Sequence, residues 1–407
     1  MTMKILMVSE DVPHHAMGGL ARHAITLARR LSFAGHKVDF MGNNVVPFED
    51  VRNDIELSGH FFPDLNMKNV GWKETQMGLY NPLRRPFIAW QFARAIIRRA
   101  GGYDVVHYHG HFPLLANHIP RDINFVQTRH DQGSDCLAHV RFKNHDVCTE
   151  ISPMACAGCA TPNPNLIQHG ISASAAWVYR RLVARAFLRH KTIFVSDMLR
   201  RNFSRVAGRQ EWGSVVHNFV DCSALQHHAL SNIAPSNMTE VFVAGKLYEP
   251  KGIEAFLRDI RARVPDTMRI TIAGDGNQEA ALRQRYGGDR VELLGWQTYP
   301  ETMRRMSGAN IVVIPSIVEE SCATTVLEAL ALGKATFGLN RGGTPELKIY
   351  ERYPGQLQLF DRMEDLIAAV ICAKPMTSNK LGTAEPIKAD ISVLLDSILQ
   401  IYSADRI

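Results

Sequence analysis

The 407-residue sequence predicts an α/β protein with two doubly wound parallel sheets. Short apolar runs rich in β-branched residues recur along the whole chain, without alternation of polar and apolar side chains, which is typical of buried parallel strands. Helical patterns lie between most of these runs. There are about a dozen runs, which is too many for one ordinary sheet, so we expect two sheets of about six strands each.

The predicted strands fall into two groups. In the first half of the chain they are 4–9, 37–42, 104–110, 123–128, 192–196 and 214–220. In the second half they are 241–245, 269–274, 291–296, 311–316, 334–340 and 356–360. The helical patterns cover 20–34, 84–100, 174–190, 251–263, 277–286, 323–332 and 363–373. The clearest helix, 20–34, places Leu20, Ala24, Leu27 and Leu31 on one face and ends at Gly35.

A change of composition predicts the domain boundary. Residues 222–239 are rich in Ser, Asn and Ala and contain Pro235, so we expect a linker there between domains 1–221 and 240–385. A last helical pattern lies within 386–407, after Pro386. We expect two Rossmann-like domains that face each other across a cleft.

Charge and hydropathy limit the class of protein. Lys and Arg number 46 and Asp and Glu 40, so the net charge of +6 is too mild to indicate a nucleic-acid partner. The sequence has no apolar run near the ~18 residues that cross a bilayer. The apolar stretch at the start is too short for a signal peptide, so we expect a cytoplasmic protein.

Glycines and lysines follow two of the predicted strands, where ligands bind in open parallel sheets. Gly18 and Gly19 open the helix at Leu20, where backbone amides can approach an anion, although a turn that simply needs glycine would look the same. Lys246 and Lys251 flank the loop after strand 241–245 and could hold a diphosphate, or they could be solvated surface lysines.

A second candidate set follows strand 311–316. Glu320 lies on the loop, and Glu328 lies eight residues later on the next helix, where it could bind a ribose or interact favourably with the helix dipole. Thr324 and Thr325 are expected to cap that helix.

These motifs occur in an order that resembles a known family. The segments are GGLARHA, GKLYEPKG, AGDG, LLGW, IPSIVEESCATTVLEALALGK and RGGTPEL. Together they resemble the retaining nucleotide-sugar glycosyltransferases of family 4, in the glycogen-synthase-like clan with the GT-B fold. The resemblance covers nearly the whole chain and is strongest from about 240 to 347.

The resemblance implies roles for residues of the second domain. Lys246 and Lys251 would hold the donor diphosphate, Glu320 would lie near the transferred sugar, and Glu328 would bind the ribose. The donor would also contact the loop and helix start that follow Glu320, namely Ser321, Cys322, Ala323 and Thr324.

In the first domain, the resemblance implies that Gly18 and Gly19 close over the phosphates. His130 would contact the donor sugar near the reaction centre, and the final helix would cross back onto this domain. Two features depart from the family pattern. Ser321-Cys322-Ala323 replaces the usual Gly-Phe-Gly, and Lys246 replaces the commoner arginine, which keeps the charge but loses its bidentate fork.

The resemblance implies transfer of a hexose or N-acetylhexosamine, with retention, from a nucleotide sugar to an acceptor hydroxyl. UDP is the expected nucleotide, and the acceptor is a carbohydrate, a lipid-linked intermediate or a small molecule. The sequence contains no Asp-x-Asp motif, so we expect catalysis that requires no metal cofactor. An epimerase or hydrolase of the same architecture and a non-catalytic nucleotide-sugar-binding protein remain alternatives.

Four of the seven cysteines lie close together in a segment, about 131–165, that we expect to be an insert. Cys136, Cys148, Cys156 and Cys159 could hold a structural zinc, since Cys156 and Cys159 have the two-residue gap of zinc knuckles. Reduced thiols and reversible disulfides are the alternatives. His107, His109 and His111 alternate along a strand end, and we expect them to line the cleft without a metal.

The segment 82–102 carries five arginines together with Phe87, Trp90 and Phe92. A basic amphipathic helix of this kind can rest on the cytoplasmic face of a membrane. We favour the alternative, in which the helix packs on the first sheet and exposes a solvated basic face.

Overall fold

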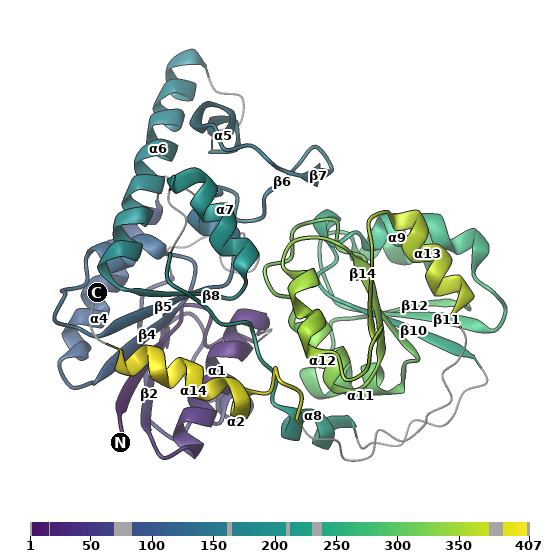
Figure 1. The fold of residues 1–407 in the computed structure, drawn as a ribbon, viewed down its shortest axis with the longest axis horizontal. Helices are drawn as coiled ribbons and strands as arrows, with labels where there is room; N and C mark the ends of the chain where they lie inside the picture. Colours follow the sequence, from purple (N-terminus) through teal and green to yellow (C-terminus); the bar gives the residue numbers. More distant parts are fainter. Residues whose placement is uncertain are drawn as a thin grey trace. The chain divides into compact units, whose positions relative to one another are not determined.

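The computed structural model describes residues 2–15, 17–68, 84–160, 165–208, 212–229, 238–373 and 386–404. Residues 82–83 of the predicted basic helix, 161–164 of the insert and 230–237 of the predicted linker lie outside the described residues. The chain divides into two compact units (Figure 1). Unit 1 comprises Met1–Arg141, Cys148–His217 and Ile391–Ile407, and unit 2 comprises Phe142–Val147 and Asn218–Asp390.

The core of unit 1 is a seven-stranded parallel sheet with the order β3-β2-β1-β4-β5-β8-β9. Its strands are β1 (Lys4–Val8), β2 (Lys37–Asn43), β3 (Phe61–Leu65), β4 (Val105–His109), β5 (Phe125–Arg129), β8 (Lys191–Phe194) and β9 (Ser214–Val215). Every residue of the central strands β4 and β5 is buried, because helices cover both faces of the sheet.

Most helices of unit 1 lie on the two faces of this sheet. They are α1 (Gly19–Phe33), α2 (Arg52–Ile55), α4 (Arg85–Ala100), α5 (Pro153–Ala160), α6 (Leu166–Arg189), α7 (Asp197–Ala207) and α14 (Ile391–Ser403), with the short 3-10 helices η1 (Phe48–Val51), η2 (Pro113–Asn117) and η3 (Gln132–Ser134). In Figure 1, α1 and α14 lie side by side on one face, and α6 and α7 lie on the other, whereas α5 packs on α6. The predicted α/β alternation is therefore confirmed.

Unit 2 contains a six-stranded parallel sheet with the order β12-β11-β10-β13-β14-β15. Its strands are β10 (Thr239–Ala244), β11 (Met268–Ala273), β12 (Val291–Gly295), β13 (Ile311–Ile314), β14 (Ala335–Leu339) and β15 (Leu357–Phe360). All six correspond to predicted strands. The hairpin β6 (Phe142–Lys143) and β7 (Asp146–Val147) is also grouped with this unit.

Helices cover both faces of the unit 2 sheet as well. They are α8 (Cys222–Ala229), α9 (Ile253–Ile260), α10 (Glu279–Tyr286), α11 (Tyr299–Gly308), α12 (Thr324–Ala331) and α13 (Met363–Cys372), with η4 (Glu249–Lys251), η5 (Arg261–Arg263) and η6 (Thr344–Tyr350). Side chains of α9 and α13 pack with β10, β11 and β13 in one hydrophobic core. On the opposite face α11 and α12 contact each other and α8.

The C-terminal helix α14 belongs to unit 1, as the predicted crossing back requires. The hydroxyl oxygen of Tyr402 lies 2.6 Å from Nδ1 of His107 in β4, and both side chains are buried. Lys191 donates to the carbonyl oxygens of Tyr402 and Ala404, at 3.2 and 2.7 Å. A cation at the last carbonyls of a helix is a favourable interaction, so these contacts hold α14 on unit 1.

Several elements differ from the predictions. Strand β3 was not predicted, because Pro63 and Asp64 interrupt its apolar run; it is an edge strand, where proline is tolerated. Helix α6 begins at Leu166, eight residues before the predicted start. Part of the predicted linker forms α8, which packs on α11. No helix among the described residues is both long enough and apolar enough to cross a bilayer.

Candidate functional site

In each sheet the strands run in one direction of chain order up to the strand that comes first in the sequence, and in the opposite direction beyond it. In unit 2 the reversal lies between β10 and β13, which are neighbours in the sheet, and in unit 1 it lies between β1 and β4. Ligands of doubly wound sheets bind beyond the carboxyl ends of the strands at this point. The predicted site residues follow these strands in each unit.

The loop after β10 carries Lys246 and Lys251 and is fixed by glycines. Gly274 has φ +148°, and a Cβ atom there would lie 1.9 Å from the carbonyl oxygen of Gly245. Leu247 donates its N–H to the carbonyl of Asp275 at 2.6 Å. The AGDG segment therefore holds the loop in place, with Lys246 exposed and Lys251 at the end of η4.

Lys251 and Glu320 form an ion pair. Nζ of Lys251 lies 2.5 Å from Oε1 of Glu320, and the hydroxyl of Ser316 donates to the same oxygen at 2.5 Å. Ser316 follows β13, whereas Lys251 comes from the loop after β10. The structure thus joins two residues that the sequence predicted independently.

The ion pair keeps both groups charged. Burial alone would raise the pKa of Glu320, but the charge of Lys251 and the hydrogen bonds of Lys251 and Ser316 lower it below its ordinary value. Burial would likewise lower the pKa of Lys251, but Glu320 and Tyr248 raise it. Unit 2 therefore presents an ammonium beside a carboxylate at the reversal point of its sheet.

The loop that follows β14 holds the backbone of Glu320. Gly343 donates its N–H to the carbonyl of Glu320 at 2.7 Å. Gly342 has φ +59°, and a Cβ atom there would lie 2.5 Å from the backbone nitrogen and oxygen of Glu320. The RGG segment therefore needs glycine at 342 for close backbone approach.

Residues 321–324 lead into α12. The thiol sulfur of Cys322 is buried and accepts the N–H of Asn218 at 3.3 Å, and burial raises the pKa of this thiol to about 12. Ala323 is the N-cap of α12, with no side-chain hydrogen bond, so the predicted capping by Thr324 or Thr325 is wrong. An N-terminus without a side-chain cap leaves first-turn N–H groups for an anion.

Glu328 lies on α12, and its side chain is buried. Ser321, Ala323 and Thr324 are partly exposed at the start of the same helix. All the predicted donor-binding residues of the second domain thus belong to three segments: the loop after β10, the loop after β13, and α12.

In unit 1, Gly18 is the N-cap of α1 and Gly19 is its first residue. Gly18 has φ −78°, which any residue can adopt, and none of the described residues places an atom within 4 Å of a Cβ built there. The described fold therefore does not itself require glycine at position 18.

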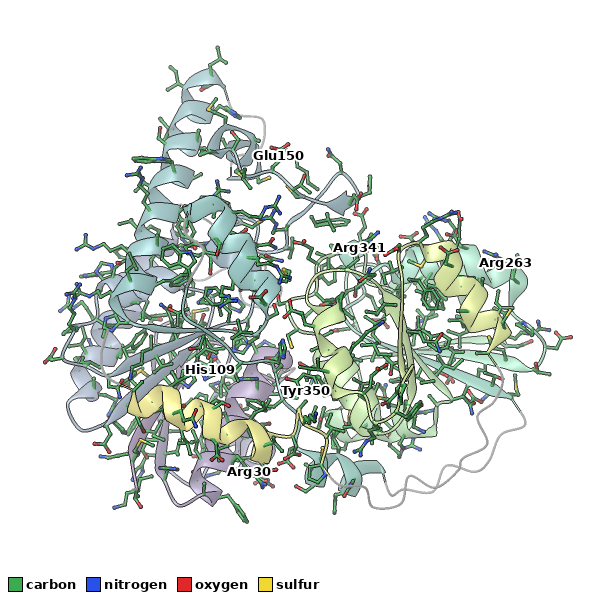
Figure 2. The ribbon with its side chains drawn as sticks, viewed as in Figure 1. Arg30, His109, Glu150, Arg263, Arg341 and Tyr350 are labelled. Carbon is green, nitrogen blue, oxygen red and sulfur yellow. The ribbon has the colours of Figure 1, made fainter. Side chains whose placement is uncertain are left out.

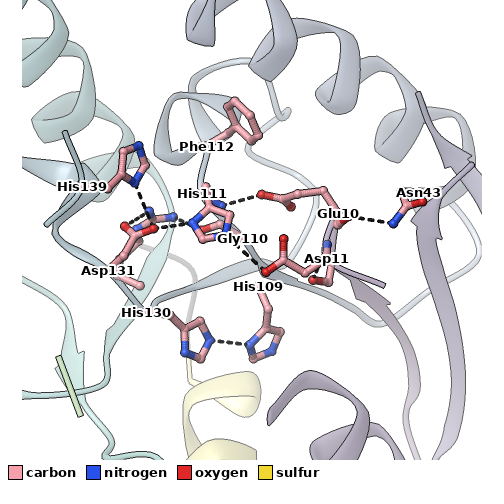
Figure 3. Close-up of polar contacts among 12 residues, drawn as sticks. Glu10, Asp11, Asn43, His109, Gly110, His111, Phe112, His130, Asp131 and His139 are labelled. Carbon is pink, nitrogen blue, oxygen red and sulfur yellow. Dashed lines mark hydrogen bonds and ion pairs between the residues drawn. The ribbon is translucent and has the colours of Figure 1, made fainter. Parts of the chain in front are cut away.

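His130 lies in a group of three imidazoles with His23 from α1 and His109 at the end of β4. Nε2 of His130 lies 3.1 Å from Nδ1 of His109 (Figure 3), and the ring centroids of His23 and His130 are 4.7 Å apart. Burial lowers the pKa of all three, that of His23 to about 3. These imidazoles are therefore neutral at ordinary pH. Figure 2 shows His109 among the side chains of unit 1.

A cluster of charged side chains, His111, Asp11, Asp131 and Glu10, lies beside the three neutral imidazoles. Nδ1 of His111 contacts Oδ2 of Asp131, and its Nε2 lies 3.3 Å from Oδ2 of Asp11 (Figure 3). His139 Nδ1 lies 3.0 Å from the same Asp131 oxygen. Burial alone would lower the pKa of His111, but the two aspartates raise it well above its ordinary value, so His111 is an imidazolium.

Glu10 completes this charged group. It accepts the hydroxyl of Tyr108 at 3.0 Å and the N–H of His111 at 2.5 Å, and burial raises its pKa to about 7. Sequence reasoning missed Glu10, Asp11, Asp131 and His139. The first three directly follow β1 or β5, so the rule that pointed to the glycines and lysines could have found them.

Two arginines of unit 1 hold the cysteine-rich segment. Arg180 of α6 donates to the carbonyl oxygen of Asp135 at 3.1 Å and to the sulfur of Cys156 at 3.2 Å. Arg141 donates to Oδ2 of Asp135 at 2.6 Å. Both guanidinium groups are buried.

Sets of three metal-ligating side chains meet at two places among the described residues. They are His23, His109 and His130, and His111, Asp131 and His139. Both sets contain the internal hydrogen bonds described above. Neither set includes Cys136, Cys148, Cys156 or Cys159, among the residues that the structure describes.

Comparison with solved structures identifies the fold as GT-B. Sucrose-phosphate synthase from Thermosynechococcus elongatus is 15% identical, with 98% of each chain covered and a TM-score of 0.67. Anabaena HepE, solved in complex with UDP-glucose, is 17% identical over 90% of this chain and 88% of its own, with a TM-score of 0.56. Trehalose 6-phosphate synthase from Burkholderia multivorans is 12% identical over 99% and 98%, with a TM-score of 0.59.

Two family descriptions match the sequence, whereas a search of curated proteins found no match. "Glycosyl transferases group 1" covers residues 239–372, within unit 2. "Glycosyltransferase Family 4" covers residues 17–224, just over half of the 407 residues. The chain therefore belongs to glycosyltransferase family 4.

Proposed function

We propose that this glycosyltransferase moves a hexose or N-acetylhexosamine from a UDP-sugar to an acceptor hydroxyl, with retention of configuration and without a metal cofactor. The observation that carries the proposal is the contact of Lys251 and Ser316 with one oxygen of Glu320. It lies at the point of unit 2 where a doubly wound sheet binds its ligand.

The reaction breaks the bond between the anomeric carbon and the diphosphate oxygen and forms a bond from that carbon to the acceptor oxygen. Negative charge develops on the leaving nucleoside diphosphate, and the ammonium groups of Lys246 and Lys251 would stabilise it. The first-turn amides of α12 and the amides of Gly18 and Gly19 would add fixed donors. The leaving phosphate oxygen takes the proton of the acceptor hydroxyl.

Glu320 has a positioning role in this proposal. A carboxylate oxygen that already accepts hydrogen bonds from Lys251 and Ser316 is a weak nucleophile, which favours orienting the sugar over a covalent intermediate. His130, neutral through burial, would hydrogen-bond a sugar hydroxyl without adding charge beside the oxocarbenium-like carbon.

The donor's nucleoside would be held by Glu328. A buried carboxylate can accept hydrogen bonds from both vicinal hydroxyls of a ribose. UDP is proposed because HepE, which has this fold, was solved with UDP-glucose. The acceptor is proposed to be a carbohydrate, a lipid-linked intermediate or a small molecule, and a structural zinc on the four cysteines remains a prediction.

The test is an activity assay of the full chain with UDP-, GDP- and ADP-sugars, with and without a panel of acceptors. We expect release of the nucleoside diphosphate only with one nucleotide, acceleration by an acceptor, an unchanged rate with a chelator, and a product with the donor's anomeric configuration by NMR. Glu320→Gln should lower turnover by about 10²-fold or more. Glu292→Gln, an exposed glutamate on the edge strand β12, is the matched control.

Other results would overturn the proposal. A donor whose sugar changes configuration without an acceptor would indicate an epimerase, and hydrolysis that no acceptor accelerates would indicate a hydrolase. Binding of UDP-sugars without any turnover would indicate a non-catalytic protein. Unchanged binding and turnover in Glu320→Gln would show that the site is placed wrongly.

A further inference from the structure

Helix α6 exposes several large apolar side chains. Exposed fractions are 93% for Leu166, 75% for Ile167 and 62% for Ile171, and Trp177 and Val178 are also exposed. In Figure 1 this end of α6 projects beyond the rest of unit 1, with α5 beside it. Isolated exposed apolar residues are ordinary, but a contiguous set on one element indicates an interaction surface.

The exposed residues form a stripe along the helix. Ile167, Ile171, Ser174, Val178, Arg181 and Arg185 are exposed at spacings of four and three residues, so they share one side of α6. The other side packs inward through residues such as Ala176, Val183 and Phe187. The outward stripe is therefore apolar in its first turns and basic in its last turns.

The exposed charges of the stripe itself have one sign, because Arg181 and Arg185 are exposed and α6 contains no Asp or Glu. Arg180 and Lys191 are buried and take no part in this surface, and residues 151–196 as a whole contain no Asp or Glu. The guanidinium carbon of Arg181 lies 4.1 Å from the ring centroid of Trp177, so a cation and an aromatic ring stand together where the apolar part ends. Aromatic and basic side chains at such a boundary are typical of helices that lie in a membrane interface.

We infer that the exposed stripe of α6 binds the surface of an anionic lipid bilayer. A second copy of the chain is a poorer partner, because a symmetric pairing of this stripe would bring together arginines with no carboxylate in 151–196 to neutralise them. A purely apolar partner would leave Arg181 and Arg185 without a counter-charge. The bilayer supplies both an apolar interior for the first turns and anionic headgroups for the arginines.

The sequence of segment 82–102, which contains α4, is compatible with a membrane contact, whereas the inference assigns the contact to α6. In α4, Ile88, Phe92 and Ile96 are buried within unit 1, so that helix packs as the sequence favoured. Its exposed apolar side chains are Phe87, Trp90 and Ile97, with Arg94 beside Trp90, which is a smaller apolar set than that of α6. The two helices can be tested separately.

The experiment is co-flotation of the full chain with vesicles of phosphatidylcholine alone or of phosphatidylcholine and phosphatidylglycerol in equal parts. No donor or acceptor is present, so the result is independent of the proposed function. We expect the chain to bind the anionic vesicles at least about tenfold more strongly than the vesicles of phosphatidylcholine alone. Binding to the anionic vesicles should weaken at about 0.5 M salt. Ile167→Gln/Ile171→Gln and Arg181→Glu/Arg185→Glu should each lose at least about tenfold in partitioning.

Ile349→Gln is the matched control, because Ile349 in unit 2 is also 62% exposed, and it should bind as the parent does. Thermal melting checks that each variant is folded. Equal partitioning by the α6 variants and the parent overturns the inference, as does loss of binding only in Phe87→Gln/Trp90→Gln. Failure to bind either kind of vesicle also overturns the inference. In that case α6 would instead pair with a second copy of the chain or with an acidic protein.

Discussion

Nζ of Lys251 and Oε1 of Glu320 lie 2.5 Å apart, although the two residues are 69 positions apart in the sequence. Each keeps the other charged in a partly buried place. This pair links the stability of unit 2 to its proposed chemistry, and both can be measured on the same variants.

Lys251→Ala should lower the free energy of unfolding by about 1–3 kcal/mol, because it leaves the Glu320 carboxylate with Ser316 as its remaining described partner. The double variant Lys251→Ala/Glu320→Ala should recover part of this loss. A double-mutant cycle from urea unfolding should give a coupling energy of about 0.5–3 kcal/mol. A coupling energy of zero would mean that the two side chains do not interact in solution.

Gly18→Ala separates function from folding. Since φ at Gly18 is ordinary and no described atom lies near a Cβ there, stability should change by less than about 1 kcal/mol. If the amides of Gly18 and Gly19 bind an anionic group of the donor, the added methyl group should lower kcat/KM by about tenfold or more. Gly35→Ala is the control with the opposite expectation. Because φ at Gly35 is +90°, alanine there should lower the stability, whereas the activity per folded molecule should not change.

The sheets could be predicted from the sequence, because buried parallel strands are continuous apolar runs. Helix starts were harder, since they depend on capping side chains. Asn165 and Gln168 form a capping box at the start of α6. The residues that follow are apolar on the exposed side of the helix as well, so the first turns show no clear separation of a polar and an apolar face. Helix α7 is absent from the predicted helices, although Ser196 and Gly208 at its two ends are the residues expected of a helix cap and a helix stop.

The proximity of Lys251 and Glu320 could also be predicted, because both lie in loops that follow neighbouring strands of one sheet. The same rule could have found the acidic residues of the charged cluster in unit 1, but not which of them His111 contacts. His111 meets Asp11 across 100 positions and Asp131 across 20, so only the tertiary fold reveals that its two ring nitrogens face two carboxylates. The perturbed pKa of His111 follows from that arrangement and from no local motif.

The four cysteines stay a prediction that metal analysis can test. A structural zinc would give about one zinc per purified chain, absent in Cys156→Ser/Cys159→Ser and retained in Cys372→Ser, an exposed cysteine outside the segment. Zinc-free protein with an unchanged melting temperature in a chelator would mean that contacts such as those of Arg180 and Arg141 hold the segment without metal.

Tyr402→Phe tests the anchoring of the C-terminal helix. The variant leaves Nδ1 of buried His107 without the hydroxyl that lies 2.6 Å away, so the free energy of unfolding should fall by about 1–3 kcal/mol. Hydrogen exchange should increase mainly in α14 and β4. Tyr286→Phe in α10 of unit 2 is the control, and equal effects of the two variants would contradict an anchoring role for Tyr402.

Acid should unfold unit 1 before unit 2. Eight histidines of unit 1 have pKa values lowered chiefly by burial. Six of them are the more deeply buried ones: His23, His107, His109, His130, His139 and His190. In the unfolded chain each of these imidazoles binds a proton below a pH of about 6.5, whereas in the folded unit the imidazole stays neutral. The stability that each imidazole contributes is therefore present above a pH of about 6.5 and is lost as the pH falls. Each adds a slope of up to about 1.4 kcal/mol per pH unit.

Glu10 opposes this trend, because its pKa is raised to about 7, so the folded unit binds this proton at a higher pH than the unfolded chain does. His111 opposes it only above a pH of about 6.5, because below that pH its imidazole is protonated in both states. In this pH range one carboxyl group thus acts against six imidazoles, so the net stability of unit 1 should fall steeply between about pH 6.5 and 4. Hydrogen exchange read by mass spectrometry at several pH values should therefore show peptides of β4 and β5 opening at a higher pH than those of β10 and β13. His190→Gln, which removes one of the six, should shift the opening of unit 1 to lower pH, whereas His15→Gln, at an exposed position, should not. Opening of unit 2 at the same or a higher pH would show that these histidines do not govern the acid stability of the chain.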